Sequence, residues 1–243
     1  RGPSHVITTG CASSSDAIAY AMLLIRAGIV SAVVVGGADA PISHGALFAF
    51  EKMKVVSTRK WDHPAQSSRP FSADRDGFVL GEGAWMMVLE DADHAEARHA
   101  QPIAEILGSG STCDAYHRVQ IAPDLAECVR AIGIACDDAD VSADEIEYVN
   151  RVFGPCAPHI PMSATKSMIG HPQGACGAAG VAATILCLRQ RKLHPTINLH
   201  MPDPACDLDY VANVSRDSDA TLALCNCIAF GSKNSALVLR VLR

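Results

Sequence analysis

The sequence lacks several patterns, and each absence argues against a class of protein. No apolar run reaches the roughly 18 to 20 residues that a membrane-spanning helix needs. The opening RGPSH is not followed by the apolar core of a signal peptide. The net charge of -6 gives no basic footprint for nucleic acid. We therefore expect a soluble, cytoplasmic protein that binds neither membrane nor nucleic acid.

Cysteine is abundant but follows no disulfide or zinc pattern. Ten cysteines are scattered over 243 residues without a C-x-x-C pair, and 49% of the residues are hydrophobic, enough for a core without disulfides. Cys225 and Cys227 form a C-x-C pair inside an apolar run, where core packing is favoured over metal ligation because no second ligand cluster accompanies them. We expect free thiols, no metal and no cofactor.

The order of apolar and polar segments predicts an α/β protein of two similar halves, 1–99 and 100–243. In the first half, the run at 31–41 is typical of a central parallel strand, and a Pro- and Arg-rich segment reads as a long surface loop. The predicted elements of the first half are a strand at 6–9, a helix at 16–26, a strand at 31–41, a loop at 57–77 and a strand at 82–90. Those of the second half are strands at 101–116, 145–150, 208–211, 220–231 and 235–242, a helix at 124–139, and a strand, turn and helix within 159–192.

The stretch HVITTGCASSSDAIAYAMLLIRAG, from His5 to Gly28, places one thiol between a strand-like run and a helix-like run. Cys11 stands at the predicted first turn of the helix, where unpaired N–H groups and the helix dipole favour a thiolate. Its neighbours are small, as a sharp strand-to-helix turn requires if a backbone N–H is to face an oxyanion. The alternative is a buried structural cysteine, since cysteine is among the most buried residue types.

A thiol nucleophile needs a partner base, and His171 in TKSMIGHPQGACGAAG is the best-placed histidine. The small residues after it would let another helix approach closely and bring His171 to Cys11. The alternative is a surface-turn histidine before Pro172. Lys166 would supply a fixed positive charge or be solvated. The G-x-x-G-x-x-G spacing in this segment differs from the G-x-G-x-x-G of dinucleotide sites.

The run NCIAFGSKNSALVL predicts two strands joined by a glycine turn. At that bend, Phe230 and Gly231 would present backbone N–H groups, which could serve as a second oxyanion donor. The alternative is an ordinary hairpin with a core phenylalanine.

Four motifs in this order, TTGCASSSDAIAYA, RPFSADRDGFVLGEGA, SATKSMIGHPQGACGAAG and NCIAFGSKNSALVL, resemble the β-ketoacyl-acyl-carrier-protein synthases of fatty acid and polyketide assembly. The resemblance implies a thiolase-like fold of layered α-β-α-β-α build. It also implies that Cys11 accepts the acyl group, that His171 and Lys166 are catalytic, and that Phe230 is the gating aromatic whose N–H shares the oxyanion hole with that of Cys11. The implied partners are an acyl carrier protein and a second synthase subunit, in a homodimer or heterodimer. A thiolase would instead carry a second catalytic cysteine where AFGSKN stands.

Two departures from the family pattern affect the expected reaction. Family members carry a long segment before the nucleophile, so part of the first half-domain is expected to be absent here. After Asn150, where the family has a histidine-glycine-threonine loop, the chain continues as RVFGPCAPHIP, and His159 does not take that place. We expect an acyltransferase that catalyses decarboxylative condensation with malonyl-carrier. The alternative is a non-catalytic or acyl-transfer-only partner of a complete synthase.

An acidic enzyme that binds an acidic carrier protein needs a local basic patch. One candidate cluster follows the second predicted strand and enters the long loop, and the other ends the predicted helix of the second half. The first comprises Lys52, Lys54, Arg59 and Lys60, and the second comprises Arg189, Arg191 and Lys192. A plain solvated face is the alternative for each.

Overall fold

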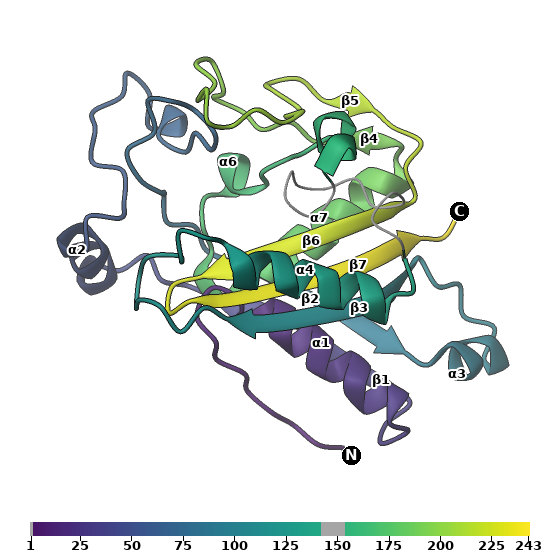
Figure 1. The fold of residues 1–243 in the computed structure, drawn as a ribbon. Helices are drawn as coiled ribbons and strands as arrows, with labels where there is room; N and C mark the ends of the chain where they lie inside the picture. The colour runs from purple at the N-terminus through teal and green to yellow at the C-terminus, as the bar shows by residue number, and fades with distance from the viewer. Residues whose placement is uncertain (1, 142–153) are drawn as a thin grey trace.

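The computed structural model describes residues 2–141 and 154–243, and these build alternating layers of sheet and helix (Figure 1). A two-stranded sheet is followed by a pair of helices, then by a three-stranded sheet and an outer helix. The two main sheets are β1 (Ala32–Asp39) with β2 (Gly83–Glu90), and β3 (Ala104–Cys113) with β7 (Lys233–Val241) and β6 (Leu222–Ala229). The helices are α1 (Ser13–Arg26) and α7 (Cys176–Arg189) between the sheets, and α4 (Ala126–Asp138) outside.

The first sheet departs from the predicted parallel arrangement. β1 pairs with β2 in the antiparallel sense, with Val35 opposite Met87. The predicted strand at 6–9 is wrong: only an isolated bridge between Thr9 and Cys11 forms there, and Val6 is 91% exposed. Apolar composition marked these residues as strand, but a strand also needs a neighbouring edge to pair with.

The second sheet agrees with the sequence. β7 lies between β3 and β6 and pairs antiparallel with both, with a register shift between Ile106 and Gly108. α4 packs directly on β3 at Gly110. A Cβ added at Gly110 would lie 2.0 Å from the carbonyl oxygen of Ala131, which leaves no room for a side chain there. Glycine is therefore required at Gly110 for the helix to approach this closely.

The main core lies between the two sheets, where α1 and α7 pack together. Both helices are rich in small residues at their starts, and Gly177 in α7 faces α1 so closely that an added Cβ would stand 2.1 Å from the hydroxyl oxygen of Ser15. The buried apolar residues of this core come from α1, β1, α7 and β7: Ile18, Ala21, Val35, Ala178, Val181, Leu188, Leu237, Leu239 and Val241. The small residues thus bring the N-terminal ends of α1 and α7 together.

Shorter elements connect these layers. The predicted loop at 57–77 is confirmed as irregular apart from one short 3-10 turn and an isolated bridge at Ser72. The predicted strand at 208–211 forms only an isolated bridge at Tyr210. The predicted strand at 145–150 and the junction after Asn150 lie outside the described residues. No helix in the described ranges has the length and apolar character to cross a bilayer. The remaining elements are α2 (His44–Lys52), η1 (Pro64–Gln66), α3 (Ala92–Ala97), η2 (Gly154–His159), α6 (Lys166–Ile169), η3 (Gln173–Ala175), β4 (Lys192–Leu193) and β5 (Arg216–Asp217).

Candidate active site

The chain turns sharply at Gly10, immediately before Cys11. Gly10 has φ +67°, a left-handed conformation that glycine adopts without strain. Ser13 fixes the turn, because its hydroxyl donates to the Gly10 carbonyl at 2.6 Å and accepts from the backbone N–H of Thr9 at 2.9 Å. Cys11 therefore precedes the N-cap residue Ala12 of α1 instead of lying in its first turn. The predicted turn is confirmed, but the nucleophile candidate stands one step further out from the helix.

His171 is held from the other side of the molecule by the loop before β2. Its backbone N–H donates to the Val79 carbonyl at 2.7 Å, and its carbonyl accepts from Gly81 N–H at 3.1 Å. Gly170 has φ +70°, and a Cβ there would lie 3.0 Å from the carbonyl oxygens of Val79 and Leu80. The histidine is thus clamped against a loop about 90 residues earlier in the chain, and the surface-turn alternative is wrong because His171 is 8% exposed.

The two side chains meet. His171 Nε2 lies 3.1 Å from Cys11 Sγ, within hydrogen-bond distance for sulfur. The Cys11 thiol also donates a hydrogen bond to Gln173 Oε1, at a sulfur-to-oxygen distance of 3.6 Å. Burial by itself lowers the pKa of His171, but the hydrogen bonds with Cys11 and Cys176 outweigh it and raise that pKa above its ordinary value. A raised imidazole pKa beside a sulfur is the arrangement that stabilises an imidazolium-thiolate pair.

Aromatic side chains enclose the histidine. Phe78 stands edge-on to the His171 ring, with centroids 5.2 Å apart, and contacts both Phe50 of α2 and Phe230. Phe230 lies in the turn between β6 and β7, and its carbonyl oxygen would be 3.5 Å from a Cβ at Gly10. The predicted turn therefore lies against the Cys11 segment. The N–H of Gly231, however, donates to the Arg118 carbonyl at 2.8 Å, which removes it as a candidate oxyanion donor, and the role of the Phe230 N–H stays a prediction.

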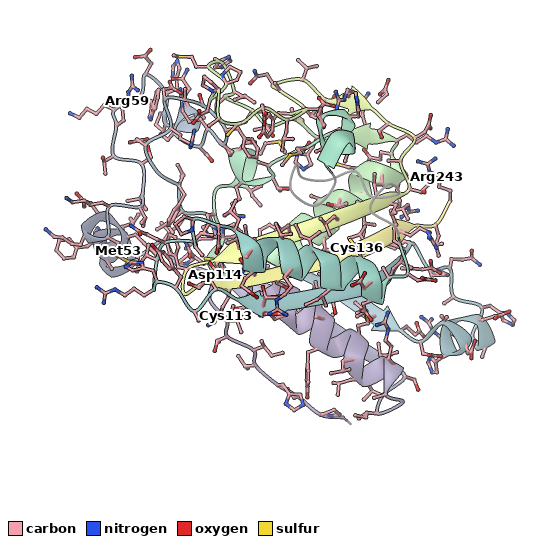
Figure 2. The ribbon with its side chains drawn as sticks, viewed as in Figure 1. Met53, Arg59, Cys113, Asp114, Cys136 and Arg243 are labelled. Carbon is pink, nitrogen blue, oxygen red and sulfur yellow. The ribbon has the colours of Figure 1, made fainter. Side chains whose placement is uncertain are left out.

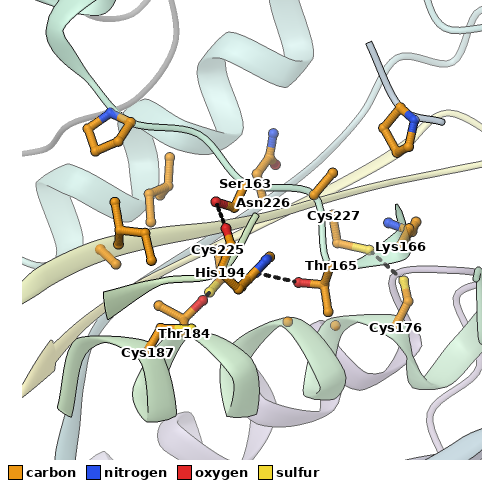
Figure 3. A pocket seen from close by; sticks show the side chains of 18 of the residues that line it. Ser163, Thr165, Lys166, Cys176, Thr184, Cys187, His194, Cys225, Asn226 and Cys227 are labelled. Carbon is orange, nitrogen blue, oxygen red and sulfur yellow. Dashed lines mark hydrogen bonds between the residues drawn. The ribbon is translucent and has the colours of Figure 1, made fainter. Parts of the chain in front are cut away.

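Lys166 lies at the start of α6, on the wall of a cavity of about 410 Å³ that α7 and β6 also line (Figure 3). Burial by itself lowers the pKa of Lys166, but attraction to the thiol groups of Cys176, Cys227 and Cys11 outweighs it and raises that pKa. Figure 3 shows Lys166 beside Cys227. Lys166 therefore keeps a positive charge close to the nucleophile candidate, and the solvated alternative is wrong.

Four neighbours of Cys11 and His171 were not predicted from the sequence as part of the site. Phe78 stands in the quoted motif RPFSADRDGFVLGEGA, and Gln173 and Cys176 follow His171 directly, but no local pattern gives their direction. Cys227 was assigned to the core, and it is buried there. The nine cysteines that the structure describes are all free thiols.

Family models and curated proteins similar to this chain point to the same enzyme family. The model of the β-ketoacyl synthase N-terminal domain matches residues 1–95, and that of the C-terminal domain matches 103–151 and 149–200. The chain is 37% identical to 3-oxoacyl-[acyl-carrier-protein] synthase 2 of Staphylococcus aureus over 258 residues, covering 99% of this chain and 64% of that protein. The corresponding Rhizobium meliloti synthase is 38% identical, covering 99% of this chain and 61% of that protein.

Solved structures show the same likeness in three dimensions. A ketosynthase in complex with a type II PKS acyl-carrier protein superposes with a TM-score of 0.97 at 32% identity, covering 100% of this chain and 64% of that chain. A β-ketoacyl synthase from Burkholderia phymatum superposes with a TM-score of 0.90 at 38% identity, covering 97% and 61%. The chain spans less than two thirds of the length of these relatives. With a thiolase-like layered fold and both domain models matched, the chain belongs to the β-ketoacyl synthase family.

Proposed function

We propose that this chain carries the acyl-accepting part of a condensing enzyme that extends an acyl thioester with malonyl-carrier, in fatty acid or polyketide biosynthesis. The observation that supports this most directly is the 3.1 Å contact between Cys11 Sγ and His171 Nε2 in a buried site. A structural cysteine in the core has no need of a clamped histidine, whereas a nucleophile needs one. The contact also argues against a non-catalytic partner subunit.

In the first half-reaction, the Cys11 thiolate attacks the carbonyl carbon of the acyl-carrier thioester. Negative charge develops on the carbonyl oxygen, and the backbone N–H groups of Cys11 and Phe230 are assigned to hold it. The carbonyl then re-forms, the carrier thiolate leaves and takes a proton, and the acyl group remains on Cys11. Lys166 keeps positive potential on this region throughout.

In the second half-reaction, malonyl-carrier loses carbon dioxide and leaves an enolate. His171 Nε2, no longer paired with a thiolate once Cys11 is acylated, is assigned to donate a hydrogen bond to the enolate oxygen. The enolate carbon attacks the acyl carbonyl, the carbon–sulfur bond breaks, and Cys11 returns as thiolate. This step depends on His171 far more than the first does.

The sequence after Asn150 separates these half-reactions. A positioned donor on an enolate is worth about 3 to 4 kcal/mol, or about a hundred- to a thousandfold in rate. Without the histidine-glycine-threonine loop, we expect acyl loading to proceed and carbon dioxide release to be slow. Inserting that loop after Asn150 should accelerate carbon dioxide release by about this factor and leave loading unchanged. Equal release rates in the two proteins would mean that His171 suffices or that another group replaces the missing one.

For the carrier protein, the first basic cluster is the better docking site. Lys52, Lys54, Arg59 and Lys60 are all exposed, and within the residues described no carboxylate lies at ion-pair distance from them. In the second cluster, Arg191 and Lys192 each lie 3.6 Å from an aspartate, which reduces their pull on an acidic partner. Figure 2 shows Arg59 projecting from the outer side of the long loop. Lys52 of α2 is two residues from Phe50, which contacts Phe78, and Phe78 in turn contacts the His171 ring. We expect a second synthase subunit as a further partner, and cytoplasmic localisation.

Acyl loading tests the proposal directly. The protein is incubated with an acyl-carrier thioester, and peptide mass analysis locates the acyl group. Cys11 should carry it, and Cys11→Ala should abolish it. Cys113→Ala is the matched control, because that thiol is exposed and its hydrogen bond goes to the Gly231 carbonyl, not to Cys11 or His171. An acyl group found on another cysteine, or loading that survives Cys11→Ala, would refute the assignment of Cys11.

A further inference from the structure

Two more thiols lie directly behind the nucleophile candidate. Cys176 is the first residue of α7, and Cys227 lies in β6 near the turn that carries Phe230. Their sulfur atoms are 3.3 Å apart (Figure 3). Each sulfur also lies 3.1 Å from the carbonyl oxygen of Cys11. Both are buried, at 7% and 4% exposed. The acyl-transfer chemistry described above uses neither thiol.

These three contacts make the two thiols unequal. Two S–H groups carry two protons, so they cannot fill three short contacts at once. The hydrogen bond with Cys227 is the first cause that lowers the pKa of Cys176, and His171 and Lys166 lower it further. The same contact raises the pKa of Cys227. Cys176 is therefore the thiolate-like member of the pair and Cys227 the thiol-like member, the pattern of an attacking and a resolving cysteine.

A small oxidant can reach the pair. Both residues line the cavity of about 410 Å³, together with Lys166. Cys225 lines the same cavity from the same strand, but among the described residues its side-chain partner is the Thr184 hydroxyl at 3.3 Å and not a thiol, and burial raises its pKa to about 11. Cys225 and Cys227 thus both line the cavity, but of these two only Cys227 lies opposite another thiol, that of Cys176.

We propose that Cys176 and Cys227 form a redox-active dithiol site, which a hydroperoxide such as hydrogen peroxide oxidises to a disulfide. The Cys176 thiolate attacks one peroxide oxygen, the O–O bond breaks, and the departing hydroxide takes a proton to become water, leaving a sulfenic acid. The Cys227 sulfur then attacks the sulfenic sulfur. The S–O bond breaks, a second water leaves with the thiol proton, and the S–S bond forms. Two electrons pass from the thiols to the peroxide.

The disulfide changes the nucleophile's surroundings. With both sulfurs bonded to each other, neither can donate to the Cys11 carbonyl. The carbonyl of Cys11 then loses the hydrogen bond that the Cys227 thiol donates to it, while the contact between Cys11 Sγ and His171 Nε2 involves neither sulfur. Oxidation of the pair and modification of Cys11 are therefore separable events, and the site goes beyond the proposed condensing activity.

Peroxide titration with peptide mapping tests the site. The whole protein is treated with hydrogen peroxide, blocked with iodoacetamide, and digested with trypsin without reduction. Peptides 167–189 and 217–233 should appear joined, with the mass of two hydrogens lost, and dithiothreitol should separate them. Each peptide holds a second cysteine, so the assignment uses the Cys187→Ser/Cys225→Ser variant, in which the cross-link should persist. Cys176→Ala and Cys227→Ala should each abolish it.

The position of Cys11 in the map decides between alternatives. If the proposal holds, Cys11 in the cross-linked fraction still carries the iodoacetamide adduct. A disulfide that joins Cys11 to Cys176 or Cys227 would overturn it. So would a pair that stays reduced in the wild-type protein while Cys11 is oxidised, and this outcome does not depend on whether any variant folds. Neither result bears on acyl loading at Cys11, which is measured separately.

Discussion

Replacing His171 should slow the reaction of Cys11 with electrophiles by a factor set by one hydrogen bond. The imidazole Nε2 lies 3.1 Å from the sulfur, and the histidine is 8% exposed, so water screens the contact little. A hydrogen bond to a charged group is worth about 1.5 to 3 kcal/mol. At about 1.4 kcal/mol per tenfold, His171→Leu should lower the rate constant about ten- to a hundredfold. His171→Gln keeps a donor and should recover part of the loss.

The assay is alkylation of Cys11 by iodoacetamide at pH 7, followed by mass analysis of the peptide that contains it. His194→Leu is the matched control, because His194 lines the cavity and forms a hydrogen bond with Thr165 at 3.2 Å, and no hydrogen bond joins it to Cys11 in the described part of the chain. It should alkylate Cys11 at the wild-type rate. Circular dichroism should first confirm that His171→Leu is folded. If the folded variant alkylates Cys11 at the wild-type rate, the pairing of His171 with the Cys11 thiol is refuted.

Three further outcomes follow from the packing and charges around the site. Gly177→Ala places a Cβ 2.1 Å from the Ser15 hydroxyl, so we expect about 1 to 3 kcal/mol of destabilisation in urea unfolding and slower Cys11 alkylation; an unchanged midpoint would contradict the close approach of α1 and α7. Because the pKa of His171 in the folded state is raised above 6.5, protonation of His171 stabilises the fold fully below that pH, and this stabilisation is lost as pH rises through the folded-state pKa. The free energy of unfolding of the wild type should therefore exceed that of His171→Gln by more at pH 6 than at pH 9, and an equal difference at both pH values would contradict this prediction. Arg69 is 7% exposed and lies 2.6 Å from Asp74, so Arg69→Ala should lower the free energy of unfolding in urea by about 3 kcal/mol. Arg69→Lys should restore only part of this stability, and full restoration would show that the positive charge alone is needed.

Local sequence patterns predicted the elements whose structure depends on local chemistry. The small residues around Cys11 require a turn, and the turn is there because Gly10 can adopt a positive φ. The apolar runs of β6 and β7 predict strands, and the glycine between them predicts the hairpin that carries Phe230. The division of the chain at residues 99 and 100 stays a prediction.

Predictions that needed a distant partner failed or stayed incomplete. Val6 has the composition of a strand, but strand formation depends on a neighbouring edge that composition does not reveal. Likewise, β1 is predicted as a central parallel strand because its run is continuously apolar, and only the long-range register with β2 shows the antiparallel pairing. Phe78 was missed for the same reason, since its contact with His171 joins residues 93 positions apart.

The chemistry of the site depends on this long-range packing as much as on the residue types. Cys11 reaches its histidine because Gly177 lets α7 approach Ser15, and because the loop at Val79 holds His171 from the opposite side. The same approach places Cys176 behind the nucleophile. A larger residue at position 177 would therefore separate both contacts at once, whereas a change at Cys176 would remove the rear contact and the hydrogen bond with His171 but leave the contact between Cys11 and His171. Comparing the two variants by Cys11 alkylation and by peroxide cross-linking would thus distinguish a general loosening of the site from a specific loss of the dithiol.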